Sequence, residues 1–97
     1  MTVAELTLAA RPRLSPRARL QYDPVREKQI LLLPEGLLVL NETAAAIVAL
    51  CDGRHTVADI AADLGTQYQR PVEQEVLKLL NRLMGKQLVE AAAADDG

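Results

Sequence analysis

Aromatic residues are almost missing from this chain of 97 residues, which has no tryptophan, no phenylalanine and only two tyrosines, Tyr22 and Tyr68. A hydrophobic core must therefore be built from leucine, valine, isoleucine and alanine. Because 49% of the residues are hydrophobic, such a core can form, and wholesale disorder is not expected. A chain of this length supports one compact domain.

Cysteine is equally scarce, since Cys51 is the only one, and this excludes an internal disulfide and any Cys-x-x-Cys metal site. A single cysteine fits a reducing compartment. The sequence also lacks a secretory signal and an apolar run of 18 residues. We therefore expect a cytoplasmic protein that does not enter a membrane.

Charge of one sign is not in excess, since the formal net charge is −2 with acidic and basic residues interspersed. A nucleic-acid-binding protein usually carries a strong basic excess, so nucleic acid is not an expected partner. Four arginines do crowd the N-terminal quarter, namely Arg11, Arg13, Arg17 and Arg19. They favour a solvated arm over a contact patch.

Residues that carry out catalysis are poorly represented. The only histidine, His55, lies in a predicted turn with no nucleophile motif nearby, and we expect it to be exposed. Cys51 falls on the apolar face of a predicted helix, where a cysteine usually packs in the core. There is no glycine-rich phosphate loop and no metal-binding motif. We therefore predict a protein that is not an enzyme and that has no catalytic residue, cofactor or metal.

Three strands are predicted in the first half of the chain, at residues 19–22, 29–33 and 37–40. Asp23-Pro24 starts the first turn, and residues 34–36 form the second. The first strand alternates polar and apolar residues, whereas the third is apolar on both faces. Short connections of this kind predict an antiparallel meander.

Helical spacing follows the strands. Asn41 is a good N-cap for a first helix that Asp52-Gly53 stops. Thr56 and Asp59 form a capping-box pattern for a second helix that Gly65 ends. A third helix is predicted from Pro71 to about Gly85, and a short strand at residues 86–89. The expected fold class is α+β, a three-stranded antiparallel sheet followed by three helices, which is winged-helix-like in element order.

Three segments are expected along the chain: an N-terminal arm at residues 1–17, a domain at 18–90 and a flexible tail at 91–97. Pro12 and Pro16 interrupt any helix in the arm. Because the apolar residues of the arm have no evident local partner, we expect it to be disordered or to dock on a neighbouring subunit. Docking of this kind would favour a homodimer.

The third predicted helix has an apolar arc wider than one core requires. Its central stripe consists of Val72, Val76, Leu79, Leu80 and Leu83. Leu77 and Met84 lie beyond one edge of the stripe, beside Asn81, and the opposite edge carries Glu75, Lys78 and Arg82. Leu77 and Met84 either pack on other elements or line an open groove.

The third strand, Leu37, Leu38, Val39 and Leu40, is expected at the edge of the meander. It has neither the charge nor the proline with which proteins usually guard an edge. The edge is therefore either covered by residues 1–10 or by the C-terminal strand, or kept open for an added strand.

The segment from residue 20 to residue 64 resembles the PqqD family of pyrroloquinoline quinone (PQQ) biosynthesis proteins. The most specific motifs are Tyr22-Asp23-Pro24-Val25-Arg26-Glu27, Leu32-Leu33-Pro34-Glu35, Leu40-Asn41-Glu42-Thr43-Ala44, Cys51-Asp52-Gly53 and Thr56-Val57. The likeness continues to Leu88-Val89 and covers roughly residues 11 to 90.

The resemblance implies a peptide-recognition element of the kind that serves ribosomally made, modified peptides. Such proteins hold the precursor peptide PqqA and present it to the radical SAM enzyme PqqE, which crosslinks a glutamate and a tyrosine of the peptide. The peptide adds as a strand beside the third strand, against the third helix. The residues expected to bind it are Leu37, Leu38, Val39, Leu40, Leu77, Lys78, Asn81, Arg82 and Met84, and the sequence does not say which edge of the helix faces the strand.

A winged-helix DNA-binding domain is the alternative function. Its recognition helix would be residues 71–85, which carry Glu73 and Glu75 as well as Lys78 and Arg82 and are therefore near neutral. The connection between Gly65 and Pro71 is also longer than the usual turn of that motif.

Overall fold

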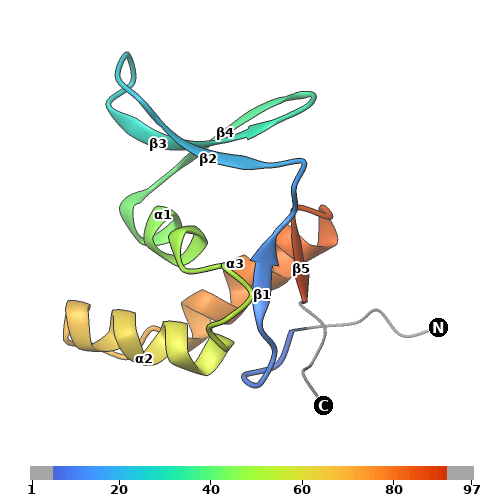
Figure 1. The fold of residues 1–97 in the computed structure, drawn as a ribbon. Coiled ribbons are helices and arrows are strands. Elements are labelled where there is room, and N and C mark those ends of the chain that lie inside the picture. Colours follow the sequence, from blue (N-terminus) through green and yellow to red (C-terminus); the bar gives the residue numbers. More distant parts are fainter. Residues whose placement is uncertain (1–5, 92–97) are drawn as a thin grey trace.

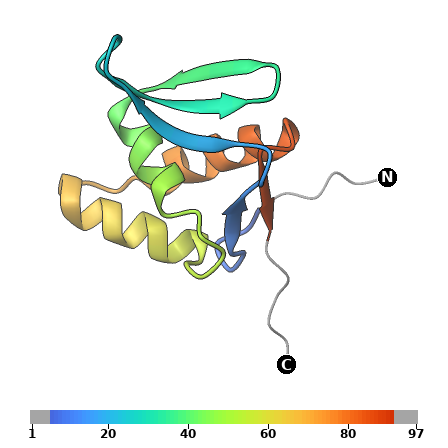
Figure 2. The same ribbon diagram turned by 45° about the horizontal axis from the view of Figure 1, so that its top comes forward.

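The computed structural model describes residues 6–91 and shows a three-stranded sheet standing over three helices, with a second, two-stranded sheet at one end (Figures 1 and 2). The elements are β1 (Pro12–Leu14), β2 (Arg19–Asp23), β3 (Lys28–Leu33), β4 (Gly36–Leu40), α1 (Glu42–Ala49), α2 (Val57–Tyr68), α3 (Glu73–Gly85) and β5 (Val89–Ala91). The predicted α+β class is confirmed. Among the described residues, no helix has the length and apolarity needed to cross a membrane.

Strands β2, β3 and β4 form the predicted antiparallel meander, in that order. Asp23 organises the first turn, because its Oδ1 accepts a hydrogen bond from the backbone N–H of Val25 at 3.0 Å and its Oδ2 lies 2.6 Å from the Arg26 guanidinium. The bond to Arg26 lowers the pKa of Asp23. The charge of this carboxylate is therefore matched within the turn itself.

The register of the sheet separates two faces. Leu20, Leu31 and Leu38 are aligned across the three strands and pack on the helix side, where Leu31 is fully buried. The helices complete this core with Ile47, Val48, Ile60, Leu64, Val76, Leu80 and Leu83. Apart from Cys51, the buried core cluster is aliphatic, as the composition requires.

Local hydrogen bonds start the first two helices where the sequence predicts. The Asn41 side chain accepts from the Ala44 N–H at 2.7 Å. Thr56 and Asp59 form the reciprocal capping box, with both bonds at 3.0 Å. These side chains satisfy amides that a helix N-terminus otherwise leaves unpaired.

The expectation that Gly65 ends the second helix is wrong. Helix α2 runs on to Tyr68 and ends at Gln69, whose φ of 58° is left-handed. Gly65 has a different role, because the chain after the helix folds back so closely that a Cβ at this position would lie 3.3 Å from the Arg70 carbonyl oxygen. Helix α3 then begins at Glu73, so that Pro71 precedes the helix and does not open it.

The N-terminal arm packs on the same core as the rest of the chain, and the expectation that its apolar residues lack a local partner is wrong for residues 6–14. Leu6 is buried, and its N–H donates to the Asn81 side chain at 2.7 Å. The carbonyls of Ala10 and Leu8 accept from the first two amides of α2, those of Val57 and Ala58, at 2.9 and 3.0 Å. The argument for a homodimer rested on an unpartnered arm and loses that support.

Strands β1 and β5 form a small antiparallel sheet that the sequence did not predict as a pair. Gln87, with φ of 63°, continues the turn after α3, so the last strand begins at Val89 and not at residue 86. Ala91, expected in the tail, lies opposite Pro12 in this sheet. Residues 1–5 of the predicted arm and 92–97 of the predicted tail lie outside the described residues.

Candidate peptide-binding site

The outer edge of β4 is the first part of the candidate site. Strand β3 pairs with one edge of β4, and within residues 6–91 no strand pairs with the other. Residues 6–10, the described part of one candidate for covering this edge, run past α2 and α3, and the other candidate, β5, pairs with β1. Backbone N–H and C=O groups along β4 are therefore placed to accept another strand.

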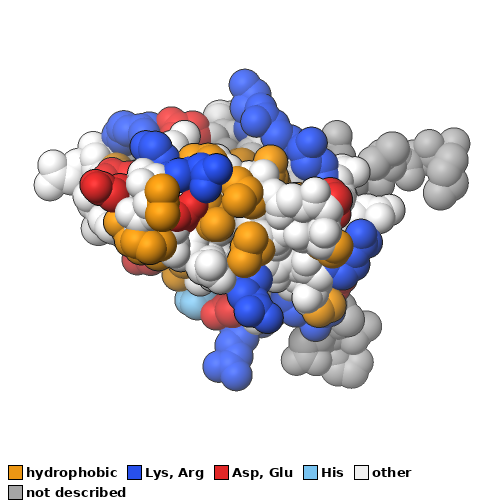
Figure 3. Space-filling view, turned by 90° about the horizontal axis from the view of Figure 1, so that it is seen from above, with side chains coloured by type: hydrophobic (Ala, Val, Ile, Leu, Met, Phe, Trp, Pro, Cys, Tyr) orange, Lys and Arg blue, Asp and Glu red, His pale blue; other side chains and the backbone are white. Residues whose placement is uncertain are grey.

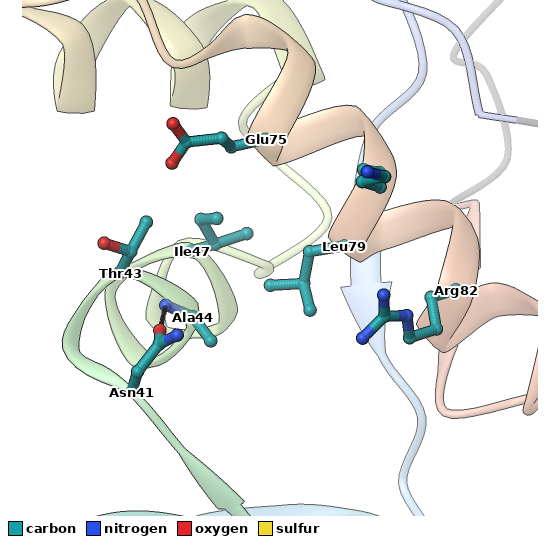
Figure 4. Close-up of a pocket in the computed structure, with 8 residues that line it drawn as sticks. Asn41, Thr43, Ala44, Ile47, Glu75, Leu79 and Arg82 are labelled. Atoms are coloured by element: carbon teal, nitrogen blue, oxygen red, sulfur yellow. Dashed lines mark hydrogen bonds between the residues drawn. The ribbon is translucent and has the colours of Figure 1, made fainter.

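A pocket between α1 and α3 is the second part, and it begins where β4 ends (Figure 4). Its volume is about 250 Å³. It is lined by Asn41, Thr43, Ala44, Ile47, Glu75, Lys78, Leu79 and Arg82. Since Asn41 directly follows Leu40, the last residue of β4, a chain running along the edge of β4 would reach the pocket.

The pocket combines apolar side chains with two unmatched cations. Leu79 extends from α3 toward Ala44 and Ile47 of α1 (Figure 4). Glu75 is bound by Arg70, at 2.6 Å, and this bond lowers the pKa of Glu75. Lys78 and Arg82 form no ion pair with any residue in the described part of the chain. The site therefore suits a ligand with apolar groups and an acidic group.

The opposite edge of α3 faces the N-terminal arm. The Asn81 side chain accepts the Leu6 N–H and is thereby occupied. Leu77 and Met84 pack against the hydrophobic core. Leu77 also borders a shallow depression beside Asn81, and Met84 borders one near Arg17 and Gln87. Of the predicted helix residues, Lys78 and Arg82 thus share the pocket, whereas Leu77, Asn81 and Met84 lie apart from it.

Helix α1 and its N-cap Asn41 contribute half of the pocket lining, and the sequence analysis did not name them as part of the site. Asn41 was identified only as a helix cap, and the apolar face of this helix only as the position of Cys51. The spacing of these residues shows which of them share a face of α1. It does not show that α1 lies beside α3, because that contact joins segments about 30 residues apart in the chain.

Cys51 and His55 lie outside this site. Cys51 is buried, its Sγ donates to the Ile47 carbonyl at 3.3 Å, and burial raises the pKa of the thiol to about 12. The predicted core position of Cys51 is therefore confirmed. His55 Nδ1 lies 3.0 Å from the Asp52 carboxylate, and hydrogen bonds, chiefly from the Arg54 N–H, lower the pKa of Asp52 to about 2.

Metal-ligating side chains are not clustered in this structure. Within residues 6–91, no group of three histidine, cysteine, aspartate or glutamate side chains is arranged to hold a metal ion.

Comparison with known families gives a match over residues 28–89 to the family described as coenzyme PQQ synthesis protein D (PqqD). The chain belongs to the PqqD family. A relative from Methylococcus capsulatus, named PqqA binding protein, is 41% identical over 68 residues, which are 69% of this chain and 73% of that protein. A protein of the same name from Bradyrhizobium diazoefficiens is 36% identical over 81 residues, 80% of this chain and 79% of that protein.

A longer relative places a PqqD-like segment inside a fusion. The bifunctional coenzyme PQQ synthesis protein C/D of Methylorubrum extorquens is 40% identical over 82 residues, which are 81% of this chain but only 22% of that protein. The same architecture has therefore been joined to a second protein in at least one PqqD relative.

Two solved PqqD structures resemble this fold. The solution structure of the PqqD truncation of Methylobacterium extorquens PqqCD, described as a stand-alone recognition element for ribosomally made, modified peptides, is 38% identical, with a TM-score of 0.76 over 88% of this chain and 94% of that chain. A crystal structure of PqqD from Xanthomonas campestris is 29% identical, with a TM-score of 0.53 over 90% and 97% of the two chains. The predicted family is thus confirmed.

Proposed function

We propose that this chain binds the precursor peptide PqqA as an added β-strand and presents it to the radical SAM enzyme PqqE in PQQ biosynthesis. The observation that carries the proposal is the edge of β4 that no strand within residues 6–91 pairs with, which leads directly into a pocket with apolar walls and two cations without an ion-pair partner in that range. Relatives that are 41% and 36% identical are named PqqA binding protein, which supports PqqA as the ligand.

Backbone pairing along β4 supplies affinity in this mechanism, and the side chains of the peptide supply selectivity. Alternate residues of an added strand point to the same side, so every second peptide residue faces the helices. An apolar residue facing Leu79 and Ile47 would be taken out of water, and a neighbouring carboxylate would meet Lys78 or Arg82. The chain itself acts as a holder in this proposal, and the chemistry belongs to the enzyme.

The direct test is a binding titration with a synthetic PqqA peptide from the same gene cluster, followed by amide shifts in NMR spectra. Binding should shift residues 36–41 and the side of α3 that carries Lys78 and Arg82. It should leave the last turns of α2 unchanged. Shifts confined to α1 and α2, with residues 36–41 unaffected, would rule out strand addition.

Duplex DNA serves as the control ligand. The exposed side chains of α3 include Glu73 and Glu75 as well as Lys78 and Arg82, so the helix offers no basic surface to phosphates. We expect no binding even at low salt, where electrostatic attraction is strongest. Tight DNA binding with a steep salt dependence would favour the winged-helix alternative.

A further inference from the structure

The face of the main sheet that points away from the helices carries an exposed apolar patch. It consists of Ile30 and Leu32 on β3 and Leu37 and Val39 on β4, which the register places in two aligned pairs. None of these four belongs to the hydrophobic core cluster on the helix side. Leu37 and Val39 are 38% and 48% exposed and Leu32 is half-buried, whereas Ile30, between Leu32 and Lys28 on this face, is buried. We call these four residues the outer patch, and Figure 3 shows apolar side chains gathered on this face of the molecule.

The outer patch is bordered by positive charge. Arg19 on β2 lies directly beside Leu32, and Lys28 lies on the same face of β3, two residues from Ile30. Neither cation forms an ion pair within the described part of the chain. Asp23, which is aligned with Lys28 across β2 and β3, is held by Arg26 at 2.6 Å. Along the strands, the outward positions therefore carry two cations, Arg19 and Lys28, and one carboxylate, Asp23, in a chain whose net charge is −2.

We propose that the outer patch docks a folded protein whose contact surface is apolar at its centre and acidic at its rim, and that this protein is the enzyme that modifies the peptide held at β4. The inference rests on the proposed function for the identity of the partner. Its physical basis is charge complementarity together with continuity, since Leu37 and Val39 belong to the strand with the open edge. A peptide strand added to β4 would extend the same face by one row, so an enzyme docked there would contact the peptide directly.

Two other occupants fit this face less well. A second copy would bring Arg19 and Lys28 of each chain against a face of like charge, which opposes association. A lipid surface would suit the positive rim, but proteins that bind at a membrane interface commonly insert tryptophan or another aromatic residue. The outer patch has no aromatic residue and lies within a paired sheet, so it does not resemble such a membrane-binding surface.

The test uses two variants placed away from the open edge. Arg19→Glu/Lys28→Glu reverses the charge of the rim on β2 and β3, and Leu32→Lys places a charge within the patch. The probe is the purified radical SAM enzyme from the same gene cluster, titrated with and without PqqA. Each variant should weaken enzyme binding at least tenfold and change PqqA affinity by less than twofold.

A matched control carries the same change in net charge elsewhere. Arg11 and Arg54 are exposed, and they lie on the arm and on the turn between α1 and α2. Arg11→Glu/Arg54→Glu should leave enzyme binding unchanged, and thermal melting should confirm that every variant is folded. Equal loss of binding in this control, or no loss in the two patch variants, would overturn the proposal.

Three further results separate the alternatives. Patch-dependent binding to vesicles of anionic lipid without enzyme binding would show a lipid surface and overturn the proposal. A dimer in solution that the patch variants dissociate would show that a second copy occupies the face, and would also overturn it. If the unmodified chain fails to bind PqqA, the proposed function fails, whereas enzyme titration without peptide still tests the patch.

Discussion

The two edges of helix α3 differ, because the N-terminal arm packs on one and the other borders an open pocket. On one edge, Asn81 binds the backbone of the N-terminal arm, and Leu6 fills the core beside it. On the other edge, Lys78 and Arg82 border an open pocket and have no ion-pair partner within residues 6–91. The same helix therefore holds the fold together along one edge and is available to a ligand along the other.

The contrast extends to the whole molecule. On the closed side, the arm satisfies the first amides of α2, and β1 and β5 pair with each other. On the open side, no strand within residues 6–91 pairs with the outer edge of β4, and Leu37 and Val39 of the outer patch are exposed. An unguarded edge with apolar neighbours favours aggregation, and folded proteins usually avoid it unless a partner covers it. The difference predicts that substitutions on the closed side change stability and that those on the open side change binding.

The largest effect is expected for Leu6→Ala on the closed side. Leu6 is only 4% exposed, so the change should leave a cavity and lower the free energy of unfolding by about 2–3 kcal/mol. Urea unfolding measures the loss, and PqqA affinity of the folded variant should stay the same. Leu8→Ala is the control. Because Leu8 is 38% exposed, its truncation should lower the free energy of unfolding much less. Equal costs at the two positions would show that the arm does not belong to the core.

The next effect is expected for Lys78→Glu/Arg82→Glu on the open side. Reversing both cations should weaken PqqA binding by about tenfold to a hundredfold, the range for a lost hydrogen bond to a charged group. The binding of the unmodified chain should also weaken with added salt more steeply than that of the variant. Leu77→Glu is the matched change on the closed edge, and it should lower the melting temperature without weakening PqqA binding. If Leu77→Glu impairs binding more than the double variant does, the peptide lies along the other edge.

Features that depend on neighbours in the chain were predicted well from the sequence. The caps at Asn41 and Thr56 each use a side chain and an amide three residues apart, so the pattern contains all the information required. The three strands of the meander were found to within one residue at each end, since short turns fix their pairing.

Features that depend on distant segments were not predicted. The sheet of β1 and β5 joins residues 12–14 to residues 89–91, and no local pattern in either segment specifies the other. The arm was misjudged for the same reason, because its partners, Asn81 and Val57, are distant in the sequence. Gly65 was interpreted as a helix end, whereas its small size serves the close return of the chain at Arg70.

The candidate site shows the same division. The lack of charge and proline in residues 37–40 identified β4 as an unguarded edge but did not decide whether the chain itself covers it, and the wide apolar arc of α3 followed from its spacing. The sequence could not predict which edge of α3 faces the pocket. The contact between Asn81 and Leu6 determines which edge the N-terminal arm covers, and these residues are far apart in the chain. The sequence therefore predicted β4 and α3 as elements of the site but not α1, and tertiary contacts selected which residues share the pocket.

A pH-dependent effect is expected at Cys51, whose carbonyl receives the Leu14 N–H of the arm on the closed side. Burial raises the pKa of the folded thiol from about 9 to about 12, so the unfolded chain releases this proton first as the pH rises. The contribution of Cys51 to stability is present below pH 9 and is lost between about pH 9 and 12. At about pH 10.5 the loss should reach about 1–2 kcal/mol.

Cys51→Ala isolates this effect from the other groups that titrate in the same range. Urea unfolding of both proteins should give a stability difference that becomes smaller from neutral pH to about pH 10.5. Rapid reaction of the native thiol with a maleimide at neutral pH would contradict the burial on which the prediction depends. PqqA binding at neutral pH should be the same for both proteins, because the pocket does not include Cys51.

The smallest effect is expected for Thr56→Ala, at the start of α2 on the closed side. The Thr56 hydroxyl accepts the Asp59 N–H at 3.0 Å, and its loss should lower the free energy of unfolding by about 1 kcal/mol. The helix should still form, because the arm carbonyls of Ala10 and Leu8 hold its first two amides. Thr66→Ala is the control within the same helix, since the Thr66 hydroxyl donates to the Ala62 carbonyl, which the helix already satisfies, and it should change stability by less than about 0.5 kcal/mol. Neither variant should alter PqqA affinity, and a loss of affinity in Thr56→Ala alone would show that the closed side also takes part in binding.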